Sequence, residues 1–421
     1  MKLTILTQYY PPEVGAPQNR LSHLASHFAS EGHDVTVLTA MPNYPGGKIQ
    51  QGYGGLLRRE RNGRVRIIRT LIFPSRSAAL LPRLLNYFSF VFSSALFGSF
   101  LLSPSDFLLV ESPPLFLGVT AAWLSRLKHA KLIFNVSDLW PESAVRVGVI
   151  RQESFAHRFG MRLESFCYRH AWLVTGQSRS ILQDIEARFP DQATFLLSNG
   201  ANTKVFHPQK RTGEARARLT RNDEFVVLYA GLHGLAQGLE QILDAAQQLQ
   251  QEEGYRFVLI GDGPHKKSLI RKAEGAGIRN VTFLDSMPST AIPELLAAAD
   301  MVVVPLGMHI PGAVPSKLYE AMASGRPIVL VAGGEAAELV RRHKAGMVVM
   351  PGQVSSLVQA IRDMRCNREL AVELSENARH AAVEHYDRTQ IAKSFVRYLK
   401  SQGTDWNQAE SEQPCEANTL I

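Results

Sequence analysis

Short apolar segments alternate with stretches of helical periodicity along the chain, and this alternation occurs twice. The first series of β-rich segments comprises residues 2–7, 34–39, 65–71, 107–111, 131–136 and 171–176. The second series comprises residues 225–231, 256–263, 281–285, 301–306 and 327–331. Strands that alternate with helices are typical of a parallel, doubly wound sheet. The sequence therefore predicts an α/β protein built from two such sheets.

A polar, turn-rich stretch at 198–208, SNGANTKVFHP, separates the two series and is the predicted linker. Because 421 residues favour two domains over one, we place an N-terminal domain at 1–200 and a C-terminal domain at 201–385. A helical segment, 386–400, follows the second domain. The polar residues 401–421 show no pattern and are predicted to be disordered. Folds of this kind bind ligands at the carboxyl ends of their strands, often in a cleft between domains.

Positive charge is concentrated in the N-terminal domain. The formal net charge is +8, and eight arginines stand against one glutamate between residues 51 and 100. Such a cationic face favours an anionic partner, which is nucleic acid, a phosphorylated substrate or an anionic membrane. A solvated surface is the alternative interpretation. Cys167, Cys366 and Cys415 match no metal-ligand pattern, and the N-terminal apolar run is short for a signal peptide, so a cytosolic location is expected.

One predicted helix of the C-terminal domain begins with two charged residues. It lies in GAVPSKLYEAMASGRPIV, 312–329, where Pro315 and Ser316 suit a helix start. Exposed N–H groups at such an end can bind an anion, and Lys317 would add a positive charge for phosphate. Glu320 lies on the same helical face and could accept hydrogen bonds from ribose hydroxyls. An ordinary Lys–Glu pair on a helix surface is the alternative.

These residues also carry a resemblance to a known family. The segments PSKLYEAMASGRPIV, YAGLHGLAQGLEQILDAAQQL, FVLIGDGPHKKSL and VTFLDSMPSTAIPELLAAADMVVVPL together resemble the C-terminal domain of the family-4 retaining glycosyltransferases. YYPPEVGAPQNRLSHLASHFASEGHDVTVLT and FNVSDLWPES are similar to the N-terminal domain of that family. The similarity is greatest to the WbuB-like subgroup, the bacterial N-acetyl-L-fucosamine transferases of surface-polysaccharide assembly.

The resemblance implies a GT-B fold, in which two Rossmann-like domains face each other across a cleft. It also implies that the nucleotide-sugar donor binds the C-terminal domain, that the acceptor binds the N-terminal domain, and that the helix at 386–400 packs back on the N-terminal domain. The expected reaction moves a sugar, with retention, from a UDP-sugar to a polyprenyl-diphosphate-linked or nascent glycan acceptor in O-antigen or capsule synthesis. N-acetyl-L-fucosamine or a similar 6-deoxy amino sugar is the first expectation. No metal, cofactor or nucleic acid is implied.

Two other functions remain open at this point. A UDP-sugar 2-epimerase of the GT-B type would share the fold without needing the cationic, apolar segment of the N-terminal domain. A catalytically silent nucleotide-sugar-binding subunit is the other alternative. Gly312 keeps the silent subunit open, because it stands where the family's Glu-x7-Glu motif has its first acid.

The resemblance also implies roles for individual residues. Glu320 matches the ribose-binding acid, Lys317 faces the donor pyrophosphate, and Asp138 lies near the reacting sugar. These three are the expected catalytic residues. The expected donor-binding residues are Gly15, His233, Asp285, Ser286, Gly312, Ala313, Val314, Lys317, Leu318 and Glu320. Lys266 or Lys267 would supplement Lys317, since the family's usual basic residues after the YAG strand are absent.

Asp138 and His233 each have a structural alternative. Asp138 follows an apolar strand and would line the cleft as a carboxylate that accepts a proton or orients the acceptor, with Glu142 as a second acid nearby. It could instead cap the turn that follows. His233 lies in the loop after the YAG strand and could reach a phosphate, or it could be a surface histidine.

The segment Leu84–Ser105 contains no charged residue and is long enough to span a bilayer. The strands on either side should belong to one sheet, which argues against spanning. Its aromatic residues are expected to point around the helix, and arginines precede it, so we expect an interfacial contact with the inner face of the cytoplasmic membrane. A core helix is the alternative. The expected contact residues are Arg76, Arg83, Phe88, Phe92 and Phe97, and the protein is expected to be cytoplasmic and peripherally membrane-associated.

Overall fold

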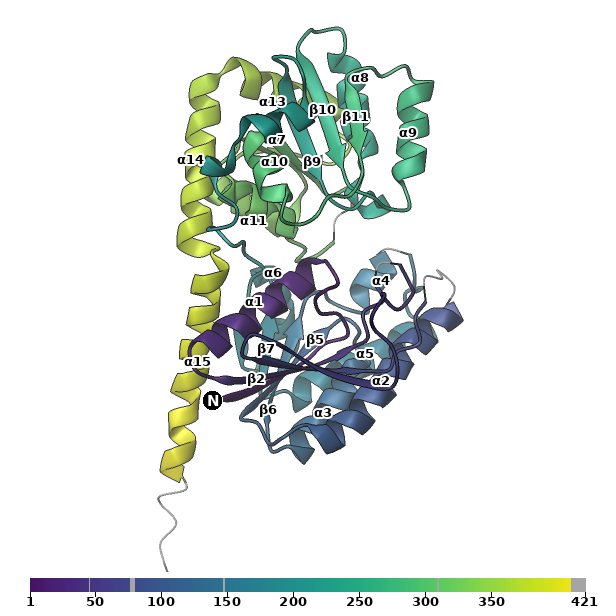
Figure 1. Ribbon diagram of the computed structural model, residues 1–421, viewed down its shortest axis with the longest axis vertical. Coiled ribbons are helices and arrows are strands. Elements are labelled where there is room, and N and C mark those ends of the chain that lie inside the picture. The colour runs from purple at the N-terminus through teal and green to yellow at the C-terminus, as the bar shows by residue number, and fades with distance from the viewer. Residues whose placement is uncertain (45, 76–79, 147, 309, 410–421) are drawn as a thin grey trace, which may run out of the picture.

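The computed structural model describes residues 1–409 except 45, 76–79, 147 and 309. Figure 1 shows two α/β domains, one above the other, with a long helical segment along one side of both. The sequence prediction of two doubly wound domains is confirmed, because each domain has its own sheet with helices on both faces.

The N-terminal sheet has the strand order β3-β4-β2-β1-β5-β6-β7-β8, and every neighbouring pair is parallel except β3–β4. Its strands are β1 (Lys2–Leu6), β2 (Asp34–Ala40), β3 (Leu57–Asn62), β4 (Val65–Thr70), β5 (Phe107–Ser112), β6 (Lys131–Val136), β7 (Leu173–Gly176) and β8 (Thr194–Leu196). The order reverses at β1, which pairs with both β2 and β5, so the loop after β1 lies at a switch point where ligands of such sheets bind.

Alternate residues of β2 point to opposite faces of this sheet. Val35 and Val37 pack with α1 (Ala16–Ser30), whereas Leu38 and Ala40 pack on the opposite side. The opposite face is covered by α2 (Leu80–Leu101), α3 (Leu117–Leu127), α5 (Phe155–His170) and α6 (Arg179–Arg188). The short helix α4 (Glu142–Arg146) follows β6.

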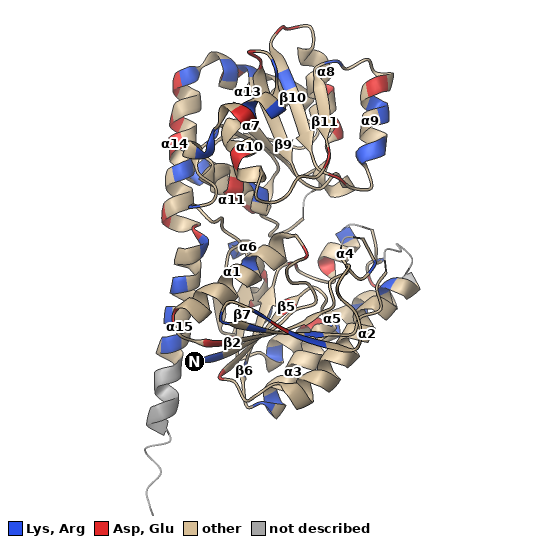
Figure 2. Ribbon diagram, viewed as in Figure 1, with Lys and Arg blue, Asp and Glu red and all other residues tan. Residues whose placement is uncertain are grey.

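The arginine-rich block forms the β3–β4 hairpin at the edge of this sheet, and Figure 2 shows the basic side of the lower domain there. Most of β3 is exposed, and charges on an exposed edge strand discourage pairing with other chains. Arg69 is the exception: it is buried and pairs with Glu60 at 2.6 Å. At least one arginine of the cationic block, Arg69, therefore stabilises the hairpin through a buried ion pair.

The C-terminal sheet is entirely parallel, with the order β11-β10-β9-β12-β13-β14. Its strands are β9 (Phe225–Ala230), β10 (Tyr255–Ile260), β11 (Val281–Leu284), β12 (Met301–Pro305), β13 (Ile328–Val331) and β14 (Met347–Val349). The surrounding helices are α7 (Gly213–Leu219), α8 (Glu240–Leu249), α9 (Lys266–Gly275), α10 (Ile292–Ala298), α11 (Ser316–Ala323), α12 (Gly334–Arg342), α13 (Val354–Cys366) and α14 (Arg368–His385). The order reverses between β9 and β12, beside the start of α11.

The chain crosses between the domains twice, and the two crossings hydrogen-bond to each other. The Ala201 N–H donates to the Tyr386 carbonyl at 2.8 Å, and the Arg388 N–H donates to the Ala201 carbonyl at 2.9 Å. Gly200 has a φ of +53°, and a Cβ there would lie 2.4 Å from the Tyr386 carbonyl oxygen. The close approach of the two crossings therefore depends on a glycine.

After the second crossing, α15 (Arg388–Ala409) packs on α1 of the N-terminal domain. Phe395 is buried there, with its ring 6.2 Å from that of Phe28. The prediction of disorder from residue 401 was wrong for 401–409, because the helix continues to Ala409. Residues 410–421 lie outside the described part of the chain.

Helix α2 is, within the described residues, the one helix long and apolar enough to span a membrane. It connects β4 and β5 of one sheet and packs against α3, an arrangement that keeps both of its ends in the same domain. As expected, its aromatic rings point to different sides of the helix. Phe90 is fully buried, whereas Phe92 and Phe100 are 71% and 78% exposed, so the helix has an inner and an outer face.

Candidate functional site

Lys317 lies across the carboxyl end of β9. A Cβ added to Gly231 would fall 1.8 Å from Lys317 Cε, and the ammonium of Lys317 lies 5.9 Å from the ring centre of Tyr229. Gly231 has a φ of +154°, which non-glycine residues rarely adopt. The glycine of the YAG segment thus makes room for the lysine at the switch point. The sequence analysis missed Gly231, although a glycine directly after a buried strand was the available signal.

The first turns of α11 hold Lys317 and Glu320 at the end of the C-terminal domain nearest the N-terminal domain (Figure 1). Burial lowers the pKa of Lys317, and the Glu320 carboxylate opposes that shift. Burial raises the pKa of Glu320, and Arg388 and Lys317 oppose that shift. Charged residues whose pKa values are shifted by burial are typical of ligand sites, and structural ion pairs show such shifts as well.

The loop before α11 touches the N-terminal domain. Gly312 has a φ of +71°, and a Cβ there would lie 2.5 Å from Ile181 Cγ1 and 2.9 Å from Ser178 Oγ. In this arrangement, a larger side chain at position 312 would collide with Ser178 and with Ile181 of α6. The carboxyl ends of β7 and β12 therefore meet at the boundary between the domains.

Of the neighbouring predicted donor-binding residues, Ala313 and Val314 are half-buried, and the Ala313 N–H donates to Ile310 O at 3.1 Å. Leu318 is fully buried in the core of the C-terminal domain. The burial of this side chain follows from its place on the apolar face of α11, and its predicted donor contact stays a prediction. The structure does not test the predicted contacts of Gly312, Ala313 and Val314 with a donor.

His233 is also buried rather than exposed to the boundary, with a side chain wedged against Tyr229 and Phe283. Within the part of the chain that the structure describes, neither ring nitrogen has a hydrogen-bond partner of good geometry, although the Ile260 carbonyl lies near enough to affect the pKa of the ring. Burial, with the charges of Lys266 and Lys317, lowers the pKa of His233 to about 4. The alternative of a surface histidine was wrong, because the glycine-rich turn 261–264 packs over the ring, and the predicted phosphate contact stays a prediction.

Asp285 and Ser286 lie exposed at the end of β11. The Asp285 carboxylate accepts a hydrogen bond from Lys266 at 2.6 Å, and this ion pair lowers the pKa of Asp285. Lys266 also donates to the Gly261 and Leu284 carbonyls at 2.9 and 3.1 Å. Lys266 thus ties the ends of two strands together and is not free for a phosphate. The predicted base contact of Asp285 and Ser286 stays a prediction.

On the N-terminal side, Gly15 is half-buried and immediately precedes the first residue of α1, at the switch point of the sheet. The loop before it is held by Glu13, whose carboxylate accepts hydrogen bonds from the N–H groups of Tyr10, Asn43 and Tyr44 at 3.2, 2.8 and 2.8 Å. Burial raises the pKa of Glu13, and these three bonds oppose the shift. Sequence reasoning missed this role of Glu13.

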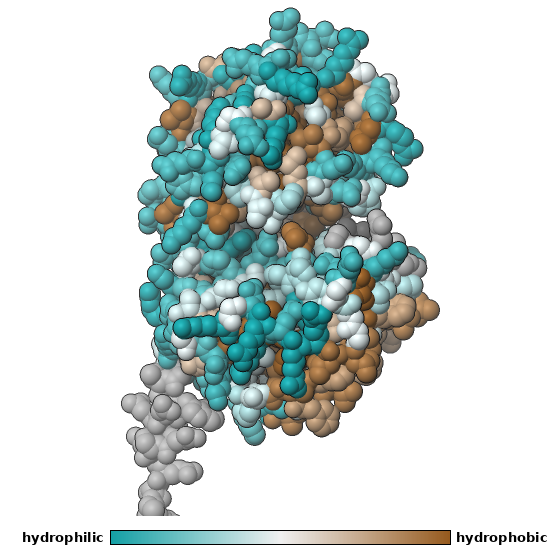
Figure 3. All heavy atoms as spheres, in the orientation of Figure 1, coloured by the Kyte–Doolittle hydropathy of each residue, from teal (hydrophilic) through white to brown (hydrophobic). Residues whose placement is uncertain are grey.

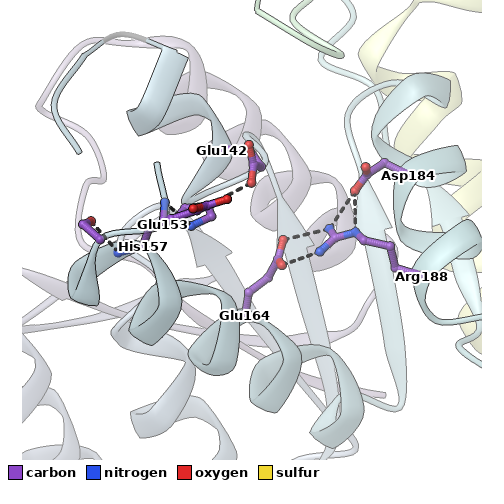
Figure 4. A network of polar contacts seen from close by, with 7 residues as sticks. Glu142, Glu153, His157, Glu164, Asp184 and Arg188 are labelled. Atoms are coloured by element: carbon purple, nitrogen blue, oxygen red, sulfur yellow. Dashed lines mark hydrogen bonds and ion pairs between the residues drawn. The ribbon is translucent and has the colours of Figure 1, made fainter. Parts of the chain in front are cut away.

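Asp138 is half-buried just after β6, at the carboxyl edge of the N-terminal sheet. Burial raises its pKa, and hydrogen bonds from Ser143 and from the Leu139 backbone oppose the shift. These two contacts fit the alternative in which Asp138 caps the turn that follows it. The position of Asp138 at the end of β6 fits the catalytic role as well. The nearby Glu142 pairs with His157 at 3.0 Å (Figure 4), so the expected second acid has a partner of its own.

Figure 4 also shows Arg188 of α6 between Glu164 and Asp184, with closest distances of 2.6 Å to each. Burial raises the pKa of Glu164, and Arg188 opposes the shift. This cluster joins α5 to α6 behind the boundary. The cluster therefore holds α6 in place, and the amino end of α6 contacts the C-terminal domain.

A buried polar network lies beneath the boundary at the carboxyl ends of β5, β6 and β7. Arg20 of α1 donates to Glu111 at 2.6 Å, to Asn199 at 2.5 Å and to Ser137 at 2.8 Å. Asn135 donates to the other Glu111 oxygen at 2.6 Å. None of these residues was singled out from the sequence, because they lie far apart in the chain and no short motif unites them.

Among the described residues, no group of three or more His, Cys, Asp or Glu side chains is arranged to hold a metal ion. The site instead presents the amino end of α11 with Lys317, the Glu320 carboxylate, the opening of α1, and Asp138 across the boundary. Two doubly wound domains that face each other, with a C-terminal helix that returns to the first, define the GT-B class of proteins.

Comparison with known proteins identifies the family. The model of the glycosyl transferase 4-like domain matches residues 15–200, and the model of glycosyl transferases group 1 matches residues 211–381. The chain belongs to the family-4 glycosyltransferases of the GT-B fold.

One similar relative is WcaI of Escherichia coli K12, described as a colanic acid biosynthesis glycosyl transferase. It is 25% identical over 415 residues, which cover 95% of this chain and 100% of WcaI. Among solved structures, sucrose-phosphate synthase from Thermosynechococcus elongatus has a TM-score of 0.75 at 18% identity, covering 96% of this chain and 100% of that one. HepE from Anabaena, solved in complex with UDP, has a TM-score of 0.71 at 19% identity, covering 95% and 100%. The two structures share the fold.

Proposed function

We propose that this protein transfers a sugar, with retention, from a UDP-sugar to a polyprenyl-diphosphate-linked or nascent glycan acceptor in bacterial surface-polysaccharide synthesis. The observation that carries the proposal is the Lys317–Glu320 pair on the first turns of α11, at the switch point of the C-terminal sheet. The UDP in the HepE structure supports the choice of nucleotide. The name of WcaI supports a role in polysaccharide synthesis.

In this proposal, the diphosphate lies against the amino end of α11, where N–H groups and Lys317 stabilise the negative charge that develops on the departing nucleotide. That arrangement supplies positive charge without a metal ion, so the transfer is proposed to be metal-independent. Glu320 accepts hydrogen bonds from the ribose hydroxyls. Gly15, at the opening of α1, offers backbone N–H groups to the distal phosphate.

Asp138 is proposed to act at the reacting centre. Its carboxylate lies at the carboxyl edge of the N-terminal sheet, where the acceptor is expected, and burial keeps its pKa above the ordinary range. A carboxylate so placed can take the proton of an attacking hydroxyl or orient the acceptor. The proposed sugar, N-acetyl-L-fucosamine or a similar 6-deoxy amino sugar, rests on the resemblance to WbuB-like enzymes.

The acceptor is proposed to arrive from the inner face of the cytoplasmic membrane. An apolar platform covers the outer faces of α2 and α3, and Figure 3 shows it as a brown area over these helices. The platform consists of the exposed residues Leu81, Leu85, Phe92, Leu96, Phe100, Val119, Trp123 and Leu127. A contiguous exposed apolar area of this kind marks an interaction surface, and the basic residues at the end of α3, Arg126 and Lys128, favour anionic headgroups.

The platform differs from the contact predicted from the sequence. Phe88 packs on Phe116 with ring centres 4.8 Å apart, and Phe97 and Arg83 are half-buried. Of the four predicted residues that the structure describes, Phe92 is therefore the one fully on the outer face. Arg76 lies outside the described residues. The difference between the platform and the predicted contact follows from the 3.6-residue period of α2, which turns one stripe of side chains outward.

The deciding experiment is incubation of the full-length protein, in detergent, with UDP-sugars and a polyprenyl-diphosphate acceptor, without added metal and with a chelator. Release of UDP with an acceptor glycosylated in the anomeric configuration of the donor would support the proposal. Conversion of the UDP-sugar to its C2 epimer without acceptor would favour the epimerase. Binding of UDP-sugar with no turnover would favour the silent subunit.

A further inference from the structure

Tyr386 directly follows α14 and lies at the second crossing between the domains. Its carbonyl accepts a hydrogen bond from the Ala201 N–H of the first crossing at 2.8 Å. A Cβ added to Gly200 would lie 2.4 Å from the same carbonyl oxygen, so the two chain segments approach closely. The backbone of Tyr386 is therefore held against the segment that leaves the N-terminal domain.

The side chain of Tyr386 reaches α11. The centre of its ring lies 5.0 Å from the centre of the Tyr319 ring, with an angle of 43° between the ring planes. Tyr319 is 2% exposed and directly precedes Glu320 in α11. This aromatic contact therefore joins the crossing to the helix that carries the proposed donor-binding residues.

Helix α14 packs along α11, and its other contributions to this packing are small side chains. Its buried residues in the core cluster that contains Tyr319 are Ala378, Ala381 and Ala382. A methyl group has no preferred direction of contact, whereas a pair of aromatic rings prefers particular arrangements, with centres about 4.5–7 Å apart. The ring of Tyr386 is therefore the group at this contact that best defines where α11 lies.

The hydroxyl end of the Tyr386 ring is also held. The hydroxyl shares a hydrogen bond with His343 Nε2 at 3.1 Å, and His343 directly follows α12. The ring of His343 in turn lies 5.2 Å from that of His385, at the end of α14. Tyr386 is thus fixed by its carbonyl, by its ring and by its hydroxyl.

We propose that Tyr386 is a positioning residue for the donor, which fixes α11 so that the carboxylate of Glu320 meets the ribose hydroxyls. This inference rests on the proposed function. A shift of the Tyr319 ring moves the backbone of its neighbour Glu320, and hydrogen bonds weaken steeply away from their preferred geometry. Lys317 has a flexible four-carbon side chain that can follow such a shift, so the effect falls mainly on the ribose contact. Tyr386 acts through α11 and is not itself a ligand contact.

The test compares UDP with 2′,3′-dideoxy-UDP, which lacks both ribose hydroxyls, by isothermal titration calorimetry of the full-length protein. Tyr386→Leu removes the ring contact and should weaken UDP by about fivefold, with less than about a twofold change for the dideoxy analogue. Tyr386→Phe keeps the ring and loses the hydroxyl, so it should restore UDP affinity to within about twofold of the wild type.

Tyr398 offers matched controls for both changes. It lies on α15, with its ring 4.8 Å from that of Phe195 in the N-terminal domain. Tyr398→Leu and Tyr398→Phe should therefore bind both ligands like the wild-type protein. If Tyr386→Leu is too unstable to measure, Tyr386→Met fills the same space without a rigid ring and should weaken UDP selectively in the same way.

Glu320→Gln shows whether the ring acts through this carboxylate. Adding Tyr386→Leu to Glu320→Gln should weaken UDP by less than about twofold further, because residues that act through one contact are not additive. Equal loss for UDP and the dideoxy analogue, or the same loss in both backgrounds, would overturn the role of Tyr386. Loss in Tyr386→Phe as large as in Tyr386→Leu would overturn the role of the ring contact. Failure of the wild-type protein to bind UDP would instead overturn the proposed function.

Discussion

The backbone N–H of Ser180 donates a hydrogen bond to Glu335 at 2.7 Å, and this bond joins the N-terminal domain to the C-terminal domain. The other oxygen of the same carboxylate accepts a hydrogen bond from the N–H of Arg179 at 2.8 Å. Glu335 thus caps the amino end of α6 from the neighbouring domain, where a negative charge interacts favourably with the helix dipole. Together with the contact of Gly312 on Ile181, this bond holds the two domains against each other.

Removing this carboxylate should loosen the contact between the domains. Because hydrogen bonds to a charged group contribute about 1.5–3 kcal/mol each, Glu335→Ala should shift the population toward more open arrangements. Small-angle X-ray scattering should show a larger radius of gyration for the variant without ligand. Glu338→Ala, an exposed change on the same helix, is the control. An unchanged radius of gyration in Glu335→Ala would show that other contacts hold the domains together.

A methyl group at Gly231 should displace Lys317 from the end of β9. The added Cβ would occupy the path of the Lys317 side chain, so Gly231→Ala should weaken UDP by about tenfold and leave uridine nearly unchanged, since the lysine acts on phosphate. Lys317→Ala should show the same selectivity. The measurement is titration calorimetry with both ligands.

Gly213→Ala is the control for that experiment, because a Cβ there meets nothing within 4 Å. Equal weakening of UDP and uridine in Gly231→Ala would indicate a general distortion of the C-terminal domain rather than a lost phosphate contact.

Asp138→Asn should lower turnover while donor binding and folding are preserved. A group that takes part in proton transfer contributes about 10²–10⁴-fold, so a fall in kcat of at least about 10²-fold is expected, with little change in KM for the donor. Burial raises the pKa of Asp138, so the wild-type rate should fall on acidification at a pH above the ordinary titration range of an aspartate. This acid limb should be absent in the variant. Turnover close to wild type would assign Asp138 to capping its own turn.

The apolar platform should mediate binding to anionic liposomes. Replacing Leu85, Phe92 and Phe100 by serine should leave the fold intact, because all three are exposed, and should reduce flotation with anionic vesicles. Binding of the unchanged protein should fall at high salt, because charges are screened beyond about 8–10 Å. Uridine diphosphate binding in the C-terminal domain should be unaffected.

Two controls accompany the liposome experiment. Val372→Ser removes an exposed apolar side chain from α14, away from the platform, and should leave flotation unchanged. Phe90→Ser should instead destabilise the protein by about 3–5 kcal/mol or more, because its ring fills the core. A folded triple variant that floats like the wild type would direct the search for the acceptor's route to another surface.

The sequence by itself determined the architecture and the ligand-bearing helix. The repeated alternation of strand and helix specified two parallel sheets, because the periods of 2 and 3.6 residues are local properties of the chain. The placement of Lys317 and Glu320 on one helical face followed from their spacing in the same way. The helical period could also have predicted which side chains of α2 face outward. This pattern was not recognised, because aromatic residues occur at nearly every turn of the helix.

Only the tertiary structure decided which side chains face the boundary between the domains. His233 and Leu318 look available in the sequence, yet packing of neighbouring segments buries both. Gly231 and Arg388 attract no notice there, yet one makes room for Lys317 and the other hydrogen-bonds to the Asn199 and Ala201 carbonyls, which joins the two crossings. Residues from positions 20, 111, 199 and 388 meet only because two crossings and three strand ends converge. Such long-range contacts arise from the folding of the whole chain, and no local pattern encodes them.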